Sequence, residues 1–280
     1  MFMKVGMLTA PFGREPLENA VKFAAEAGFD TLEIATGPGS QHCDLTTGDA
    51  SKAKEVSDLV GGAGLEISGL ACYTNVFAEG PSLNDGIVSA IKGAVDSAAA
   101  IGLEVVCCLA GVPTSGTPKE TMIKEWAPKA WLPIADHAQS KGVKIAFENW
   151  FATLLQSTQE FIWFFEACDH PALGLNYDPS HLVHQGCDLH EPVELFADRI
   201  FHTHAKDTDV NERVLRRIGN QNRGWWRYCI PGYGMIDWGQ YVATLRENGV
   251  DNVLSIEHED RALGREEGFL RGLAYLRQFA

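Results

Sequence analysis

The sequence is poor in basic residues. Lysine and arginine together number 23, against 37 aspartates and glutamates, which gives a formal net charge of −14. A field of this sign repels phosphate backbones and anionic membrane surfaces. The composition therefore argues against nucleic acid or a membrane as a partner.

The chain also lacks the cysteine spacing of a redox or structural-metal motif. Its seven cysteines are scattered with no C-x-x-C, and an odd number leaves one unpaired in any disulfide scheme. The adjacent Cys107 and Cys108 lie in an apolar run, which favours small buried thiols over a redox pair. We expect a reducing, cytoplasmic location.

No apolar run is long enough to span a membrane, and the apolar part of the N-terminal MFMKVGMLTAPFG is too short for a signal peptide. Low-complexity tracts, Ser/Pro linkers and blocks of like charge are absent as well. With 45% apolar and 21% charged residues, the composition is typical of a soluble globular protein with a sizeable core. We expect one domain over residues 1–280.

What the chain does contain is a series of eight short runs rich in β-branched and apolar residues. They begin at Lys4, Thr31, Glu66, Glu104, Lys144, Ala172, Arg199 and Asn252. Segments with helical period, such as LENAVKFAAEAG and QYVATLRENG, separate the runs, and several end in a glycine suited to a helix C-cap. The alternation predicts an α/β protein with a closed (β/α)8 barrel. An open doubly wound sheet is the alternative.

One long insertion interrupts this alternation, at about residues 208–230. It follows the seventh run, is rich in Arg, Asn and Trp, and leads into PGYGMIDW. Long loops in compact domains usually carry function, so we expect it to cover the barrel mouth and exclude water. A loop that packs outside the barrel or against a neighbouring subunit is the alternative.

The active site of a (β/α)8 barrel lies at the carboxyl ends of its strands. Four consecutive runs end in polar residues there, namely Glu148, Asp178, His204 and Glu257. Three carboxylates that converge on one mouth repel each other unless a cation lies between them. The sequence thus predicts one divalent metal ion bound by these four residues. An oxygen-rich set without thiolate favours Mn²⁺, with Mg²⁺, Co²⁺ and Zn²⁺ as alternatives.

The seventh run contains FHTHAKD, in which His202, His204 and Lys206 alternate and so project from one face of a strand. We assign His204 to the metal. His202, one layer deeper, is expected to be a packed and hydrogen-bonded barrel residue. Lys206 and Asp207 are expected to hold neighbouring ligands in place, and Lys206 is also a candidate substrate contact.

Several of these motifs are similar to those of one known family. They are FEN at Glu148, NYDPSHL with Asp178 and His181, HAKD from His204, PGYGMIDW from Pro231, and SIEHED with Glu257. Along essentially its whole length the chain resembles the sugar phosphate isomerase/epimerase family of xylose isomerase-like TIM barrels. The resemblance implies that Glu148, Asp178, His204 and Glu257 bind one metal, and that the two glutamates exchange protons with the substrate.

The resemblance also implies two substrate contacts, and the chain differs from part of the superfamily at one motif. His181 and Arg227 match positions that contact substrate oxygens. Endonucleases of the same superfamily place a D-x-H pair of zinc ligands before the G-x-G turn, where this chain has Trp226, Arg227 and Tyr228. With those ligands missing and a charge of −14, DNA repair is disfavoured.

Other polar and aromatic residues are candidates for the rim of the site. They are Trp150, Tyr73, Asn75, His42, Trp225 and Trp226. Core packing is the alternative for each aromatic among them. No Gly-rich phosphate cradle is present, although Arg216, Arg217 and Arg223 could bind a phosphate in its place.

A metal that chelates adjacent carbonyl and hydroxyl oxygens acidifies the neighbouring C–H and stabilises the enediolate that follows. We therefore expect a metal-dependent isomerase or epimerase for a small-molecule ketose or related keto-sugar, with Glu148 and Glu257 as bases on opposite faces of one carbon. A lyase or dehydratase for a keto-glycoside or keto-inositol shares the first step. A non-catalytic sugar-binding barrel is a third interpretation, and a homo-oligomer is left open.

Overall fold

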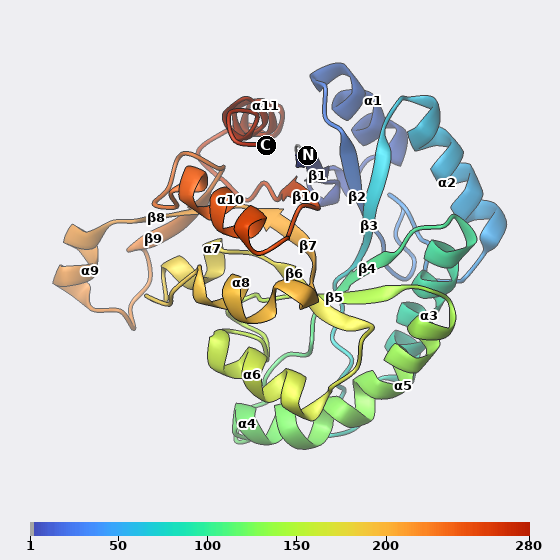
Figure 1. Cartoon of the computed structure of the whole chain (residues 1–280), viewed down its shortest axis with the longest axis horizontal. Coiled ribbons are helices and arrows are strands. Elements are labelled where there is room, and N and C mark those ends of the chain that lie inside the picture. The colour runs from blue at the N-terminus through green and yellow to red at the C-terminus, as the bar shows by residue number, and fades with distance from the viewer. Residues whose placement is uncertain (1–2) are drawn as a thin grey trace.

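Eight parallel strands close into a barrel in the computed structural model, which describes residues 3–280 (Figure 1). Around the barrel their order is β1, β10, β7, β6, β5, β4, β3 and β2. The strands are β1 (Lys4–Leu8), β2 (Thr31–Ala35), β3 (Glu66–Cys72), β4 (Val105–Cys108), β5 (Lys144–Glu148), β6 (Leu173–Tyr177), β7 (Ile200–Ala205) and β10 (Val253–Ile256). The predicted closed barrel is confirmed, and an open sheet is excluded.

Helices fill the connections between strands and surround the barrel (Figure 1). They are α1 (Leu17–Ala27), α2 (Ala50–Gly62), α3 (Asp85–Ala100), α4 (Lys119–Thr121), α5 (Ala127–Ser140), α6 (Thr158–Ala167), α7 (Ser180–Val183), α8 (Glu191–Phe196), α9 (Glu212–Ile218), α10 (Trp238–Glu247) and α11 (Arg265–Leu276). Within residues 3–280, no helix is long and apolar enough to cross a bilayer.

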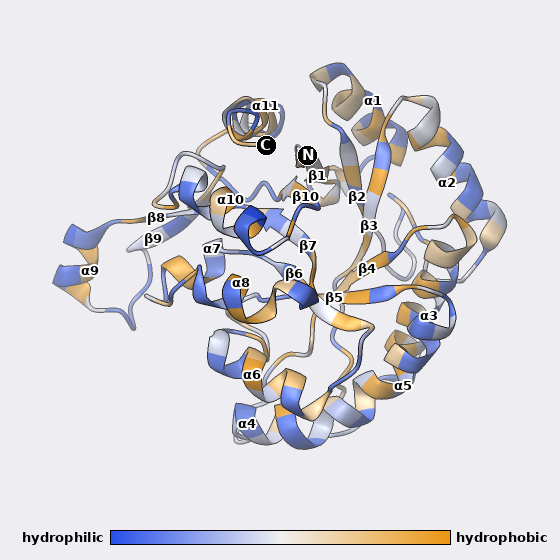
Figure 2. Ribbon diagram, viewed as in Figure 1, coloured by the Kyte–Doolittle hydropathy of each residue, from blue (hydrophilic) through white to orange (hydrophobic). Residues whose placement is uncertain are grey.

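Local sequence explains where these helices begin, end and pack. In α1 the buried side chains Ala20, Val21 and Ala24 recur at helical spacing, and the helix ends at Gly28, whose φ of 84° suits a left-handed cap. The side chain of Asp237 caps α10 by accepting a hydrogen bond from the Gln240 amide. Figure 2 shows the result, with hydrophobic and hydrophilic residues side by side along each outer helix.

The barrel interior contains both a small apolar cluster and buried polar side chains. Leu8, Ala71, Cys107 and Ala146 form an apolar cluster of their own, separate from the main core between strands and helices. The small alanine side chains leave room for larger polar groups from the opposite wall. Buried polar side chains reach into that space from β2, β6 and β7.

The insertion is a hairpin rather than a plain loop. Strand β8 (Asp207–Val210) pairs antiparallel with β9 (Trp226–Cys229), and α9 lies between them and extends away from the barrel (Figure 1). Neither strand was predicted, because DTDV and WRYC are short and carry charged residues, so neither contains an apolar run.

A glycine turn after the hairpin wraps around the buried carboxylate of Asp207. Oδ2 accepts hydrogen bonds from the Gly232 and Gly234 amides and from Trp238 Nε1, at 3.1, 3.2 and 3.0 Å. A Cβ at Gly234 would overlap this carboxylate and lie 2.6 Å from the Thr208 carbonyl oxygen. PGYGMIDW therefore encodes a turn that closes on Asp207, and its glycines permit the close approach.

Replacement of Gly234 by Ala should thus lower the free energy of unfolding by about 1–3 kcal/mol, the usual range for overpacking. The measurement is urea denaturation followed by tryptophan fluorescence. Gly61→Ala is the matched control, because a Cβ there meets no atom within 4 Å in α2 and alanine favours helix. Equal stability of the two variants would contradict the close packing on Asp207.

Candidate active site

The four polar strand ends predicted from the sequence meet at one mouth of the barrel. Their strands β5, β6, β7 and β10 are neighbours. From Nδ1 of His204 the distances are 3.8 Å to Glu148 Oε1, 3.8 Å to Asp178 Oδ2 and 3.2 Å to Glu257 Oε2. The structure therefore brings the imidazole and the three carboxylates within reach of one ion.

A second imidazole, that of His181, joins the same carboxylates from the start of α7. Its Nε2 lies 3.1 Å from Glu148 Oε1 and 3.5 Å from Asp178 Oδ2. Together with Glu257, these residues offer donor atoms that all lie within 4.8 Å of one another. Because its Nδ1 lies 2.6 Å from the Tyr228 hydroxyl, the hairpin strand β9 also fixes the orientation of His181.

Lys206 places an ammonium group among the carboxylates. Its Nζ lies 2.5 Å from Glu257 Oε2, 3.0 Å from Glu259 Oε2 and 3.3 Å from Asp178 Oδ2. The side chain is almost fully buried, with 1% exposed, so these ion pairs are little weakened by water. Lys206 thus lies next to the predicted ligands, as expected, whereas Glu259 was not among the predicted site residues.

The far side of His204 is held by a carboxylate that the sequence analysis missed. Glu33, on β2 and wholly buried, has Oε2 at 2.9 Å from His204 Nε2. Its carboxylate also accepts hydrogen bonds from the hydroxyls of Tyr73 at 2.8 Å and Ser255 at 2.9 Å. The one available signal was a lone glutamate inside the apolar run TLEIA. Such a carboxylate fixes the ring so that Nε2 bears the proton and Nδ1 faces the mouth.

The donor atoms at the mouth fit a divalent cation. His204 Nδ1 and Asp178 Oδ2 are buried and make no hydrogen bond, which is rare for buried polar atoms and marks a place for a partner. The neighbouring donors are carboxylate oxygens and imidazole nitrogens, the ligand types of Mn²⁺, Mg²⁺ and Zn²⁺ sites. Glu148, Asp178, Glu257 and one or both imidazoles could therefore hold a metal ion.

The two glutamates differ in protonation. Burial, and then the Glu257 carboxylate, raises the pKa of Glu148 to about 8. Burial would also raise the pKa of Glu257, but the Lys206 ammonium and His204 outweigh it and hold that pKa below its usual range. Environments that move two neighbouring carboxyl groups apart in pKa are typical of acid and base partners.

The two imidazoles differ as well. Burial and the Lys206 ammonium lower the pKa of His181 to about 3, so this ring is neutral at pH 7. Burial alone would lower the pKa of His204, but the Glu33 and Glu257 carboxylates outweigh it and raise the pKa well above its ordinary value. A cation that binds to Nδ1 of His204 therefore displaces a proton.

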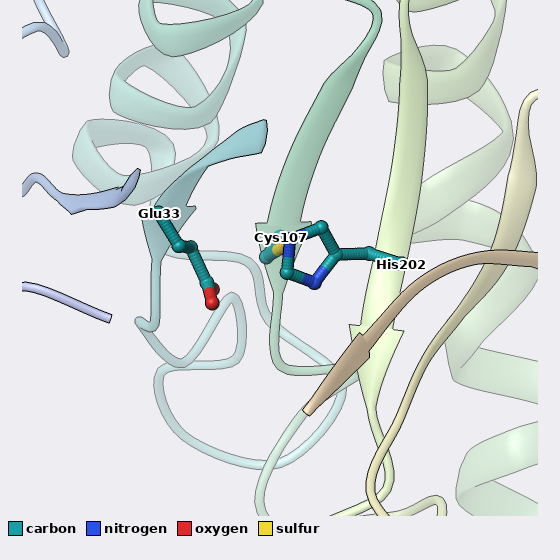
Figure 3. Close-up of side chains that lie close together, drawn as sticks. All are labelled: Glu33, Cys107 and His202. Carbon is teal, nitrogen blue, oxygen red and sulfur yellow. The ribbon is translucent and has the colours of Figure 1, made fainter. Parts of the chain in front are cut away.

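A second cluster of donor atoms lies deeper in the barrel, formed by Glu33, Cys107 and His202 (Figure 3). Both His202 nitrogens are already engaged, Nδ1 with Asn176 Oδ1 at 2.8 Å and Nε2 with the Ser68 hydroxyl at 3.1 Å. Burial raises the pKa of the Cys107 thiol well above its ordinary value, which disfavours the thiolate that metals bind. The cluster supports the mouth from below, and the expectation of a packed, hydrogen-bonded His202 is confirmed.

Two cavities open at the mouth. The deeper one, about 270 Å³, is bordered by Tyr73, Glu148, Trp150, His181, Lys206, Glu257 and Glu259, with Leu109. An outer one of about 780 Å³ lies between the loop after β5, strand β9 and the loop after β10, and Arg227 and Trp226 line it. The structure thus brings three of the six predicted rim residues to the mouth, namely Tyr73, Trp150 and Trp226.

Three predicted rim residues lie elsewhere among the described residues. Asn75 is engaged with backbone groups, since its amide donates to the Phe77 carbonyl and its oxygen accepts from the Val112 amide. His42 is buried and lies 2.8 Å from the Glu15 carbonyl oxygen. Trp225 is buried beside the outer end of β9, where its carbonyl oxygen accepts from the Asn211 amide. Neither Asn75 nor His42 lines either cavity.

Residues 21–279 match the family model described as "Xylose isomerase-like TIM barrel", and the chain belongs to this family. The family predicted from the motifs is thereby confirmed. Over its whole length the chain is 26% identical to the uncharacterised protein YfiH of Bacillus subtilis, with 99% of each chain covered. It is also 27% identical to an inosose dehydratase of Clostridium botulinum, over 51% of this chain and 50% of that one.

Solved structures share the fold at lower identity. The IOLI protein with a bound zinc atom has a TM-score of 0.76 at 18% identity, and a D-psicose 3-epimerase with D-tagatose from Clostridium cellulolyticum has a TM-score of 0.76 at 15% identity. Both comparisons cover 99% of each chain. At this identity they establish a common barrel.

The ion pairs of Lys206 lead to a prediction about stability. In chelator-treated protein, Lys206→Met should lower the free energy of unfolding by about 3–5 kcal/mol, because it leaves buried carboxylates without a counter-charge. Urea denaturation is the measurement. The control Lys54→Met removes the exposed pair with Asp58 in α2 and should cost about 0–1 kcal/mol. Equal losses would mean that Lys206 does not balance the buried charge.

Proposed function

We propose that the protein is a metal-dependent isomerase or epimerase that acts on a ketose or related keto-sugar. The observation that carries this proposal is the buried group of three carboxylates and two imidazoles at the floor of the deeper cavity. The D-psicose 3-epimerase that shares the barrel, and a 3-keto-D-glucoside 4-epimerase from E. coli with a TM-score of 0.75, support the choice of substrate class.

The metal ligands in this proposal are Glu148, Asp178, His204 and Glu257. A bound divalent ion polarises the oxygens of the substrate and makes the C–H beside the carbonyl more acidic. Mn²⁺ remains the favoured ion on the oxygen-rich donor set. The zinc in the IOLI protein keeps Zn²⁺ among the candidates.

Side chains of the protein carry out the proton transfers and orient the substrate in this proposal. Glu148 and Glu257 both border the deeper cavity, on strands separated by β6 and β7, so they can address different sides of one carbon. One glutamate removes the proton and the other returns one. Neutral His181, oriented by Tyr228, can donate a hydrogen bond to a substrate oxygen or accept one from a hydroxyl.

The second candidate function is a lyase or dehydratase, and one observation favours it. Lys206 Nζ borders the same cavity and lies 2.5 Å from Glu257. A third proton carrier of this kind could protonate a leaving hydroxyl or glycosidic oxygen after the C–H is broken. The inosose dehydratases among the relatives are consistent with this reaction type.

The first test concerns the metal. Reconstituted protein should bind one divalent ion per chain, and His204→Ala and Asp178→Asn should each lose it, as measured by elemental analysis after desalting. Because cation binding displaces a proton from His204, affinity should fall as the pH is lowered. His137→Ala, which removes a partly exposed histidine paired with Asp96, is the control and should keep the ion.

The carboxylate behind His204 can be tested in the same assay. Glu33→Gln should weaken metal binding by about ten- to a hundredfold, the usual effect of removing a carboxylate that orients a histidine ligand. Competition with a chromophoric chelator measures this without any catalytic readout. Unchanged stoichiometry in both His204→Ala and Asp178→Asn would exclude the proposed ligand set.

The second test concerns proton exchange. Proton NMR in D₂O with a panel of ketoses and keto-glycosides should reveal a substrate whose C–H exchanges in the presence of metal. Glu148→Gln and Glu257→Gln, once shown to retain metal, should each lose turnover by about 10² or more. Glu120→Gln, at an exposed site on α4, is the control.

The products of that experiment separate the candidates. A new stereoisomer or aldose identifies an isomerase or epimerase, whereas an unsaturated product identifies a lyase or dehydratase. Binding of sugars without C–H exchange for any of them would support a non-catalytic sugar-binding barrel. Near-normal turnover in either metal-loaded variant would mean that the replaced glutamate binds the metal but transfers no proton.

A further inference from the structure

The deeper cavity continues into the outer one. Trp150 and Glu259 line both, so the two spaces meet at these side chains. The deeper space of about 270 Å³ is just below the range of about 300–1,000 Å³ usual for small-molecule sites, and the outer space of about 780 Å³ lies well inside it. The deeper space suits one reacting ring, and the outer space can hold a further group of at least equal size.

Aromatic side chains form a continuous wall in the outer cavity. Trp150, Phe151, Trp226 and Tyr228 follow one another edge to face, with ring centroids 6.0, 5.7 and 4.8 Å apart. Trp226 is braced by His184, which stacks on it at 3.9 Å. Half-buried aromatic groups in a cavity are typical of sites that bind a ring-shaped apolar face.

Several charged side chains of the outer cavity are already paired, whereas Arg261 lines it exposed and without an ion pair within residues 3–280. Arg227 pairs with Asp260 at 2.9 Å and Asp209 at 3.2 Å, and Arg265 pairs with Glu15 at 2.5 Å. Glutamates also occupy the first turn of α11, where they complement the helix dipole and oppose a bound anion. A phosphate would find few free donors here.

We propose that the outer cavity binds the second, uncharged ring of a glycosidic substrate whose first ring reacts in the deeper cavity. The substrate class is thus a neutral keto-glycoside with an aromatic or sugar ring as its second part. This inference rests on the proposed function, because it takes the deeper cavity as the reacting site.

Equilibrium binding to the metal-loaded protein tests the inference with unreactive probes. The probes are the methyl and phenyl glycosides of D-glucose, D-galactose and D-mannose, together with the 6-phosphates of these sugars, measured by calorimetry. For at least one hexose the phenyl glycoside should bind about tenfold more tightly than the methyl glycoside, a difference of about 1.4 kcal/mol. The 6-phosphates should gain nothing over the methyl glycosides.

Ala262→Trp tests the location of this gain. Ala262 is exposed and lines only the outer cavity, so a tryptophan there should fill the space and abolish the preference for the phenyl group. Leu195→Trp is the matched control, since Leu195 is 53% exposed on α8 and lines neither cavity. Trp226→Ala, which removes part of the wall, should reduce the preference without adding bulk.

Three results would overturn the inference. They are equal affinity for phenyl and methyl glycosides, a preference that survives Ala262→Trp, and tighter binding of a 6-phosphate than of any phenyl glycoside. Absence of binding by every probe would overturn it too. C–H exchange with a free ketose decides separately whether the proposed reaction stands, so failure of the subsite and failure of the function are distinguishable.

Discussion

The concentration of negative charge at the carboxyl ends of the strands is the constraint on which the rest of this structure depends. Glu148, Asp178 and Glu257 converge at the mouth with side chains only 7%, 0% and 15% exposed, and like charges at such sites are costly. Lys206 and His204 supply positive charge at distances of 2.5 and 3.2 Å from Glu257. The carboxylates at the mouth are stable only while Lys206 and His204 compensate their negative charge. A cation that binds there adds positive charge to the same group of residues.

Beneath this set, a hydrogen-bonded layer replaces the apolar filling usual in (β/α)8 barrels. Asn176 Oδ1 lies 2.8 Å from Nδ1 of His202, and Asn176 Nδ2 donates to the Tyr73 hydroxyl at 2.9 Å and lies beside the His204 ring. Glu33 completes the layer from the opposite wall. Because Glu33 accepts the proton on Nε2 of His204, the layer fixes this ring and leaves its Nδ1, which makes no hydrogen bond, facing the mouth.

One stretch of chain connects the fold to the site. Lys206 and Asp207 are consecutive, and they point to different surroundings. Lys206 enters the carboxylate cluster, while Asp207 anchors the glycine turn and pairs opposite Cys229 in the hairpin. The hairpin in turn carries Tyr228 to His181 and Trp226 to the outer cavity. Packing around Asp207 thereby sets the positions of groups on both sides of the mouth.

The sequence alone determined the barrel and four of its strand-end residues. Strands and helices have periods of two and 3.6 residues, which are local properties, and the end of each apolar run marked Glu148, Asp178, His204 and Glu257. The family resemblance added His181, which the structure brings to the same carboxylates. The barrel, and the meeting of these residues at one mouth, could be predicted because neither required knowledge of which strands face each other.

Tertiary structure decided the contacts that cross the barrel. Glu33 meets His204 across 171 residues of sequence, and no local pattern pairs them. The position of Lys206 within the cluster, the engagement of Asn75 with backbone groups and the hairpin in the insertion were equally beyond local pattern. Closure of the sheet brings β2 opposite β7, and side-chain packing then determines which polar atoms are hydrogen-bonded. Closure and packing each depend on contacts along the whole chain.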